Sequence, residues 1–125
     1  MSDMSGKHTP REIPKPWGSE LLWAETDLYV GKTLRVNAGE SLSLQYHEVK
    51  DETLHMLSGE IVFEVGTDIE SMETVALRVG ESFRITPGTI HRMTAVSDAE
   101  ILEVSTNHLD DVVRLEDRYG RIEKD

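Results

Sequence analysis

Four side chains in two short segments have the types and spacing of a metal site. Gln45 and His47 are two positions apart, so on a β-strand both point to the same side and can bind one ion. Glu52 follows after a short turn and can add a carboxylate. His91 follows a Pro-Gly turn into another strand and can supply a second imidazole. The sequence therefore predicts one divalent cation, held by Gln45, His47, Glu52 and His91.

This donor set indicates the kind of ion. Two imidazoles, one carboxylate and one amide oxygen suit zinc, manganese, iron(II), nickel or cobalt, and the set does not distinguish among them. Four protein donors leave an octahedral ion open positions for water or substrate, which is typical of catalytic sites. Two histidines and a carboxylate are also the ligand set of non-haem iron(II) oxygenases, so that activity stays an alternative.

The elements that must position these residues are short β-strands bounded by turn residues. The expected strands are Glu20–Ala24, Leu28–Val36, Ser41–His47, Thr53–Val65, Glu73–Leu77, Ser82–Ile85, His91–Ala95 and Glu100–Thr106. Many short strands at near-regular spacing indicate an all-β sandwich or barrel. In Ser41–His47 apolar and polar residues alternate, so the row that holds Gln45 and His47 can line a cavity of a small barrel.

Composition limits the classes of function. The chain has 125 residues, the size of one domain, and no apolar stretch near the ~20 residues that span a bilayer. The first residues contain no apolar signal region, so a cytoplasmic location is expected. Cysteine is absent, which excludes disulfides and thiolate ligands. The net charge of −11 opposes binding to nucleic acid and to anionic membranes, although a pocket can still be locally basic.

The two ends of the chain differ from its centre. Residues Met1 to Pro16 carry three prolines and are expected to form an extended arm or loop, which places an amino-terminal arm at 1–14 and a single domain at 15–125. The tail Leu109–Asp125 is highly charged, and we expect one short helix or a loop against the barrel.

The two metal-site segments resemble the paired cupin motifs, G-x5-H-x-H-x4-E-x6-G and G-x5-P-x-G-x2-H. The spacing matches at Gly39, Gln45, His47, Glu52, Gly59, Gly80, Thr86, Gly88 and His91. Gln45 stands where a first histidine is common, and Thr86 where proline is common. This resemblance implies a single cupin domain, a double-stranded β-helix or jelly-roll barrel with an extended amino-terminal arm and a short carboxyl-terminal tail.

Nearly the whole chain is similar to the cupin domain of type II mannose-6-phosphate isomerases, which often follows a GDP-mannose pyrophosphorylase domain. The matching segments are 15–19, 39 with 41–47, 58–59, 87–89 with 91–92, and 113–121. In that family the Gln-x-His, Glu and His set binds a divalent metal, so glutamine at position 45 is expected there. The family's His- and Arg-rich turn and its following His-Trp pair are replaced here by Glu48-Val49-Lys50-Asp51 and Thr53-Leu54.

The resemblance implies an aldose–ketose isomerase that acts on a small phosphorylated sugar such as mannose 6-phosphate. Lys32 and Arg92 fall at basic positions of the family domain and are expected to bind the phosphate, with Arg92 also in the catalytic group. Glu48 is the first residue to test as the catalytic base, on position alone. Two alternatives remain: the oxygenase, and a carbohydrate-binding module without catalysis. Because small β-barrels tend to pair through edge strands, we also expect a homodimer.

Overall fold

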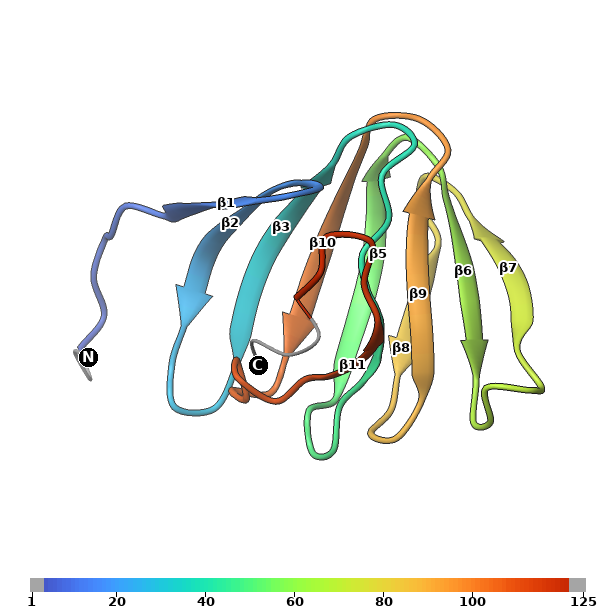
Figure 1. The fold of residues 1–125 in the computed structure, drawn as a ribbon. Coiled ribbons are helices and arrows are strands. Elements are labelled where there is room, and N and C mark those ends of the chain that lie inside the picture. Colours follow the sequence, from blue (N-terminus) through green and yellow to red (C-terminus); the bar gives the residue numbers. More distant parts are fainter. Residues whose placement is uncertain (1–3, 122–125) are drawn as a thin grey trace.

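The computed structural model describes residues 4–121 and consists of two antiparallel β-sheets that face each other (Figure 1). The six-stranded sheet has, in spatial order, β1 (Arg11–Lys15), β2 (Gly18–Glu25), β3 (Val30–Val36), β10 (Ala99–Ser105), β5 (Glu52–Ser58) and β8 (Ser82–Ile85). The five-stranded sheet has β11 (Val113–Glu116), β4 (Leu44–Tyr46), β9 (Ile90–Ala95), β6 (Ile61–Gly66) and β7 (Glu73–Leu77). This architecture confirms the expected all-β fold.

The apolar core lies between the two sheets, because inward residues alternate with outward ones along each strand. On β9 His91, Met93 and Ala95 are buried, while the residues between them are partly exposed. The fully buried side chains of the core include Leu34, Leu54, Met56, Ile61, Phe63, Ile85 and Ile101. Trp17 is 2% exposed and packs in the same cluster, so the turn before β2 is fixed to the core.

One expected strand is divided in two. The apolar run Thr53–Val65 contains β5 and β6, which belong to different sheets and are joined by a turn at Gly59. Gly59 has φ = 76°, and a Cβ at this position would lie 2.2 Å from the carbonyl oxygen of Asp98. Only glycine fits this position, which is the turn where the chain passes from one sheet to the other.

Both ends of the chain add strands that the sequence did not predict. Arg11–Lys15, expected as part of an extended arm or loop, pairs with β2 along its full length. Val113–Glu116, expected as a helix or loop, pairs with β4 beside the predicted metal ligands. Farther on, Arg118 donates hydrogen bonds to the carbonyl oxygen of Gly39 and to Ser41 Oγ, which fixes the tail to the start of the motif.

Within residues 4–121 no helix has the length and apolar character needed to cross a bilayer.

Candidate metal centre

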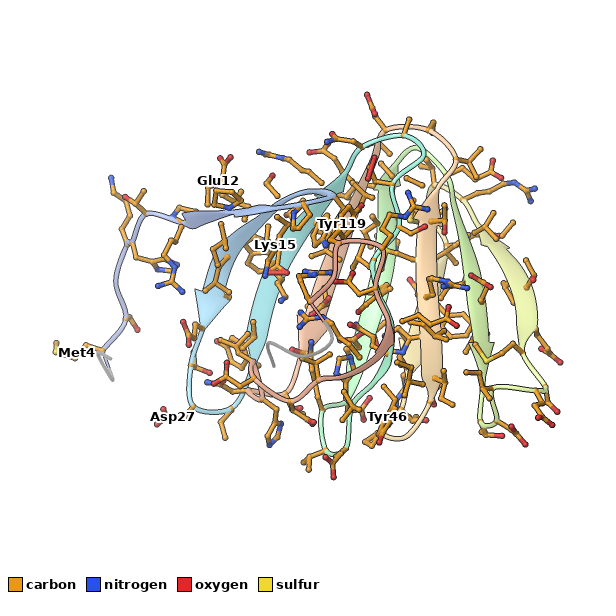
Figure 2. All side chains as sticks on the ribbon, in the orientation of Figure 1. Met4, Glu12, Lys15, Asp27, Tyr46 and Tyr119 are labelled. Carbon is orange, nitrogen blue, oxygen red and sulfur yellow. The ribbon has the colours of Figure 1, made fainter. Side chains whose placement is uncertain are left out.

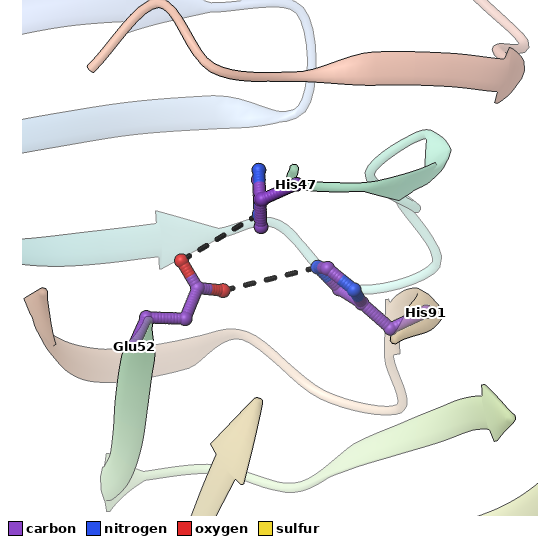
Figure 3. Close-up of side chains that lie close together, drawn as sticks. All are labelled: His47, Glu52 and His91. Atoms are coloured by element: carbon purple, nitrogen blue, oxygen red, sulfur yellow. Dashed lines mark ion pairs between the residues drawn. The ribbon is translucent and has the colours of Figure 1, made fainter. Parts of the chain in front are cut away.

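Three of the four predicted ligands meet between the two sheets, at the polar end of the core. His47 directly follows β4 and His91 lies on β9, and these neighbouring strands pair with Gln45 opposite His91. Glu52 is the first residue of β5, in the other sheet. Figure 3 shows the Glu52 carboxylate reaching toward both imidazole rings. The site therefore joins the two sheets.

The distances among these donors are close to those of a metal site. His47 Nε2 lies 3.7 Å from Glu52 Oε2, and His91 Nε2 lies 3.8 Å from Glu52 Oε1. One donor atom from each residue lies within 4.8 Å of the others, and all three side chains are buried. Donors about 2.1 Å from a shared ion lie roughly 3 Å or more apart. Small side-chain shifts would therefore bring the three donors onto one ion.

Both histidines are held with the correct nitrogen facing the site. His47 Nδ1 donates a hydrogen bond to the carbonyl oxygen of Asp111 at 2.6 Å, and His91 Nδ1 donates one to the carbonyl oxygen of Thr89 at 3.0 Å. Each Nδ1 therefore carries a proton, and each Nε2 is the ring nitrogen left to face the site. Backbone carbonyls commonly fix metal-binding imidazoles in this way.

The polar atoms of the site fit a cation. His47 Nε2 is buried and has no hydrogen-bond partner among the described residues. A buried acceptor without a partner costs about 1–3 kcal/mol, which a bound ion would remove. Burial lowers the pKa of His91 and so favours its neutral, ligating form. Burial opposes ionisation of Glu52, but neighbouring His47, Lys50 and His91 outweigh it and hold the pKa of Glu52 well below its usual range.

Gln45 lies beside these ligands with its amide turned away from a ligating orientation. Its Oε1 accepts a hydrogen bond from Ser43 Oγ at 2.7 Å, and its Nε2 lies 3.5 Å from His91 Nε2. A half-turn of the amide would exchange the two atoms, because Ser43 Oγ can then accept from Nε2. Gln45 can therefore become the fourth ligand without losing its contact to Ser43.

A buried network of charges borders the three ligands. Lys50 Nζ lies 2.8 Å from Glu52 Oε2 and 3.1 Å from Glu103 Oε2, and Lys32 Nζ lies 3.3 Å from Glu20 and 3.8 Å from Glu103. Burial and the carboxylate of Glu52 raise the pKa of Glu103 against the effect of both lysines. Burial opposes ionisation of Lys50, but Glu103 and Glu52 outweigh it and raise the pKa of Lys50. The network positions Glu52 through Lys50.

Two turns fix the segments that carry the ligands. The carboxylate of Asp111 accepts hydrogen bonds from the backbone N–H groups of Glu48, Val49 and Lys50, at 2.7–2.9 Å. In the other motif segment Gly88, with φ = 83°, donates its N–H to the carbonyl oxygen of His47 at 2.7 Å. The turn before His91 is therefore bound directly to the residue that carries the first imidazole.

The structure separates the predicted site residues into two groups. A cavity of about 270 Å³ is lined by Gln45, His47, Glu52, His91 and Lys32, together with Lys50 and Glu103. Neither Glu48 nor Arg92 is among the described residues that line it. Glu48 is exposed on the turn.

Arg92 lies in a second groove, on the outer side of the five-stranded sheet. Its guanidinium contacts Glu64 at 2.7 Å and Glu116 at 3.0 Å. Arg92 and Glu48 each follow a ligand directly in the sequence, and strand alternation turns Arg92 to the face opposite His91.

Sequence reasoning missed Lys50, Glu103 and Asp111. For Glu103 a signal was present: Ile101, Glu103 and Ser105 alternate on one face of β10, and a carboxylate on an apolar face needs a buried partner. Lys50 follows a turn and carries no such pattern, so a surface charge was the natural interpretation. The contact of Asp111 with the turn spans more than sixty positions of the chain and has no local signal.

Comparison with known proteins agrees with this geometry. Residues 32–105 match the family model described as "Cupin domain". The chain is 32% identical over 120 residues to mannose-1-phosphate guanylyltransferase ManC of Salmonella typhimurium, covering 92% of this chain and 24% of that protein. It is 33% identical over 117 residues to mannose-1-phosphate guanylyltransferase of Escherichia coli, covering 90% of this chain and 23% of that protein. The chain thus spans about a quarter of the length of these relatives.

Solved structures share the fold. KdgF from Halomonas sp. has a TM-score of 0.68 at 18% identity, covering 79% of this chain and 86% of that one. Oxalate decarboxylase from Bacillus subtilis has a TM-score of 0.73 at 14% identity, covering 89% of this chain and 33% of that one. The family model matches residues 32–105, which is more than half of the chain. The chain therefore belongs to the cupin domain family.

Proposed function

We propose that this chain is a metal-dependent aldose–ketose isomerase that acts on a sugar phosphate such as mannose 6-phosphate. The observation that carries the proposal is the buried, unpartnered Nε2 of His47 facing Glu52 and His91 in a cavity of small-molecule size. The two relatives named for mannose 1-phosphate support a phosphorylated sugar as the ligand.

His47, Glu52 and His91 would hold the ion, with Gln45 as the fourth donor. A bound zinc, manganese, iron, nickel or cobalt ion supplies Lewis-acid polarisation of a carbonyl oxygen. The protein's part is to keep Glu52 ionised, which the buried Lys50 does, and to turn both imidazole Nε2 atoms toward the site, which the two backbone carbonyls do. The burial of all three ligands keeps bulk water away from the reacting carbons.

Isomerisation also needs a base that lines the cavity. It removes the proton from the carbon next to the carbonyl and returns it to the former carbonyl carbon, while a hydroxyl proton passes to the carbonyl oxygen. Glu103 lines the cavity and is buried, whereas Glu48 is exposed on the turn. We therefore assign the proton transfer to Glu103 in place of Glu48.

The test is interconversion of mannose 6-phosphate and fructose 6-phosphate by protein loaded separately with each candidate ion. Glu103→Gln should lower kcat about 100-fold or more, because general-base catalysis contributes about 10²–10⁴-fold. Glu48→Gln, the matched control, should retain the activity of the parent. Absence of turnover with every ion would refute the isomerase, and a large loss in Glu48→Gln alone would return the base to Glu48.

One observation favours a carbohydrate-binding module without catalysis. Glu103 contacts both Lys50 and Lys32, and these two ion pairs engage the carboxylate that would act as the base. In that case the sugar phosphate would release heat in calorimetry and raise the melting temperature, while no product would accumulate.

The combination of His47, Glu52 and His91 also supports an iron(II) oxygenase as the second enzymatic candidate. Oxygen consumption that depends on iron(II) and a small organic substrate would distinguish it from an isomerase, which consumes no oxygen.

A homodimer is our proposal for the assembly. Strand β1 is at one end of the six-stranded sheet, and one of its edges has no strand partner among residues 4–121. Such an edge can pair with a second copy. Sedimentation equilibrium should give twice the chain mass, and a monomer mass at micromolar concentration would contradict the dimer.

A further inference from the structure

The cavity that contains the metal ligands is locally basic in a strongly acidic protein. Six of the chain's 13 lysine and arginine residues line it, against five of its 24 acidic residues. The concentration of positive charge is therefore specific to this cavity, and surface composition does not explain it. A cavity lined with excess cations attracts anionic ligands.

The charges in the deep part of this cavity are already compensated. Lys32 and Lys50 are both buried, and three carboxylates, those of Glu20, Glu52 and Glu103, lie within 4 Å of their ammonium groups. Binding an anion there would require breaking buried ion pairs, which is strongly unfavourable. Lys32, which the sequence predicted as a phosphate ligand, therefore has its charge neutralised by the protein itself.

Strand β1 brings further cations to the more exposed edge of the same cavity. Arg11, Ile13 and Lys15 line the cavity because they alternate on one face of the strand. Figure 2 labels Lys15 and Glu12 on opposite sides of the strand. Neither Arg11 nor Lys15 forms an ion pair with any residue in the part of the chain that the structure describes. Lys15 is half-buried, whereas Arg11 is exposed.

We infer that Lys15, assisted by Arg11, binds the anionic group of the ligand. This inference rests on the proposed function, because it takes the metal-containing cavity as the ligand site. The ligand class is a polyhydroxylated carbon chain with a phosphate or a carboxylate, the anion at β1 and the hydroxyl-bearing end toward the metal ligands. Arg92 has no part in this site, since it lies in another groove and is bound by Glu64 and Glu116.

Calorimetry on the metal-loaded protein tests the inference with three probes: mannose 6-phosphate, galacturonate and uncharged mannose. Lys15→Met should raise the Kd of the bound anion about tenfold or more and leave that of mannose unchanged. Lys15→Arg should retain binding. Lys7→Met is the matched control, because Lys7 lies in the same amino-terminal segment but outside this cavity. Its Kd values for all three probes should equal those of the parent. If mannose 6-phosphate binds more tightly than galacturonate, the anionic group of the ligand is a phosphate. If galacturonate binds more tightly, that group is a carboxylate.

The outcomes separate this inference from the isomerase proposal. Binding of an anion that depends on Lys15, without any isomerisation, would refute the isomerase and support the inference. Isomerisation with an unchanged KM in Lys15→Met would refute the inference and leave the isomerase intact. The inference would also be overturned if Lys15→Met lost equal affinity for mannose and for the anions. It would be overturned as well if the parent bound neither anion.

Discussion

Asp111 and His47 are joined by a 2.6 Å hydrogen bond from the imidazole Nδ1 to the Asp111 carbonyl oxygen. The carboxylate of the same aspartate binds three consecutive backbone N–H groups of the turn that follows His47. One residue of the carboxyl-terminal segment therefore fixes both the ring that would bind the metal and the turn that leads to Glu52. Burial opposes ionisation of the Asp111 carboxyl group, but the three N–H donors outweigh it and lower the pKa of Asp111 to about 2.

Asp111→Ala should weaken both the fold and the metal site. Three N–H groups lose their acceptor, so the free energy of unfolding should fall by about 1–3 kcal/mol. Because the turn no longer holds His47, metal affinity should fall about 10- to 100-fold. Urea unfolding and competition with a chelator measure the two effects. Asp110→Ala, at the exposed neighbouring position, is the control, and equal effects in both variants would contradict the role of Asp111.

Lys50→Met should destabilise the metal-free protein more than the metal-loaded protein. Without Lys50 the buried carboxylates of Glu52 and Glu103 lose a partner that lies 2.8–3.1 Å away, at a cost of about 3–5 kcal/mol. A bound divalent ion compensates the charge of Glu52. The loss of unfolding free energy in Lys50→Met relative to the parent should therefore be smaller when both proteins are saturated with zinc. Urea unfolding of parent and variant, once with chelator and once with zinc, gives the loss in each state.

Arg84→Met is the control for this comparison, because it breaks an exposed pair with Asp51. Its effect on the free energy of unfolding should be small, because solvent screens an exposed pair, and should not depend on metal. A loss in Lys50→Met that is the same with and without zinc would show that the metal does not share the charge of Glu52 with Lys50.

Asp117→Asn should reduce stability at neutral pH and have less effect in acid. Hydrogen bonds from Arg121 lower the pKa of Asp117 against the opposing effect of burial. A carboxyl group with a lower pKa in the folded chain stabilises the fold above its unfolded pKa, about 3.9, and this contribution is lost as pH falls through the folded value. Urea midpoints of parent and variant should therefore differ at pH 7 and converge below pH 4. A constant difference would contradict this linkage.

The sequence was sufficient where local spacing determines geometry. Gln45 and His47 share a strand face, and a short turn leads into each of Glu52 and His91. The structure brings these residues together, while metal binding itself stays a prediction. Strand β1 was missed because Pro14 interrupts its pattern, although proline is tolerated on an edge strand. Strand β11 was missed because it lies in a highly charged tail and is held by pairing with distant β4.

The residues that line the cavity were harder to predict, because proximity in sequence to a predicted metal ligand does not determine position in the cavity. Arg92 adjoins His91 and points to the opposite side of its sheet, where Glu64 and Glu116 bind it. Lys15, thirty positions before the first ligand, reaches the cavity because β1 pairs with β2 at the edge of the sheet. Such placements depend on how strands from both ends of the chain assemble.

Elemental analysis of the purified protein tests the central claim most directly, beside a variant with His47→Ala and His91→Ala. The parent should contain about one divalent ion per chain, and the variant, shown by circular dichroism to keep its β-structure, should contain almost none. No metal in the parent, even after incubation with zinc, manganese and iron(II), would contradict the metal centre and both enzymatic functions.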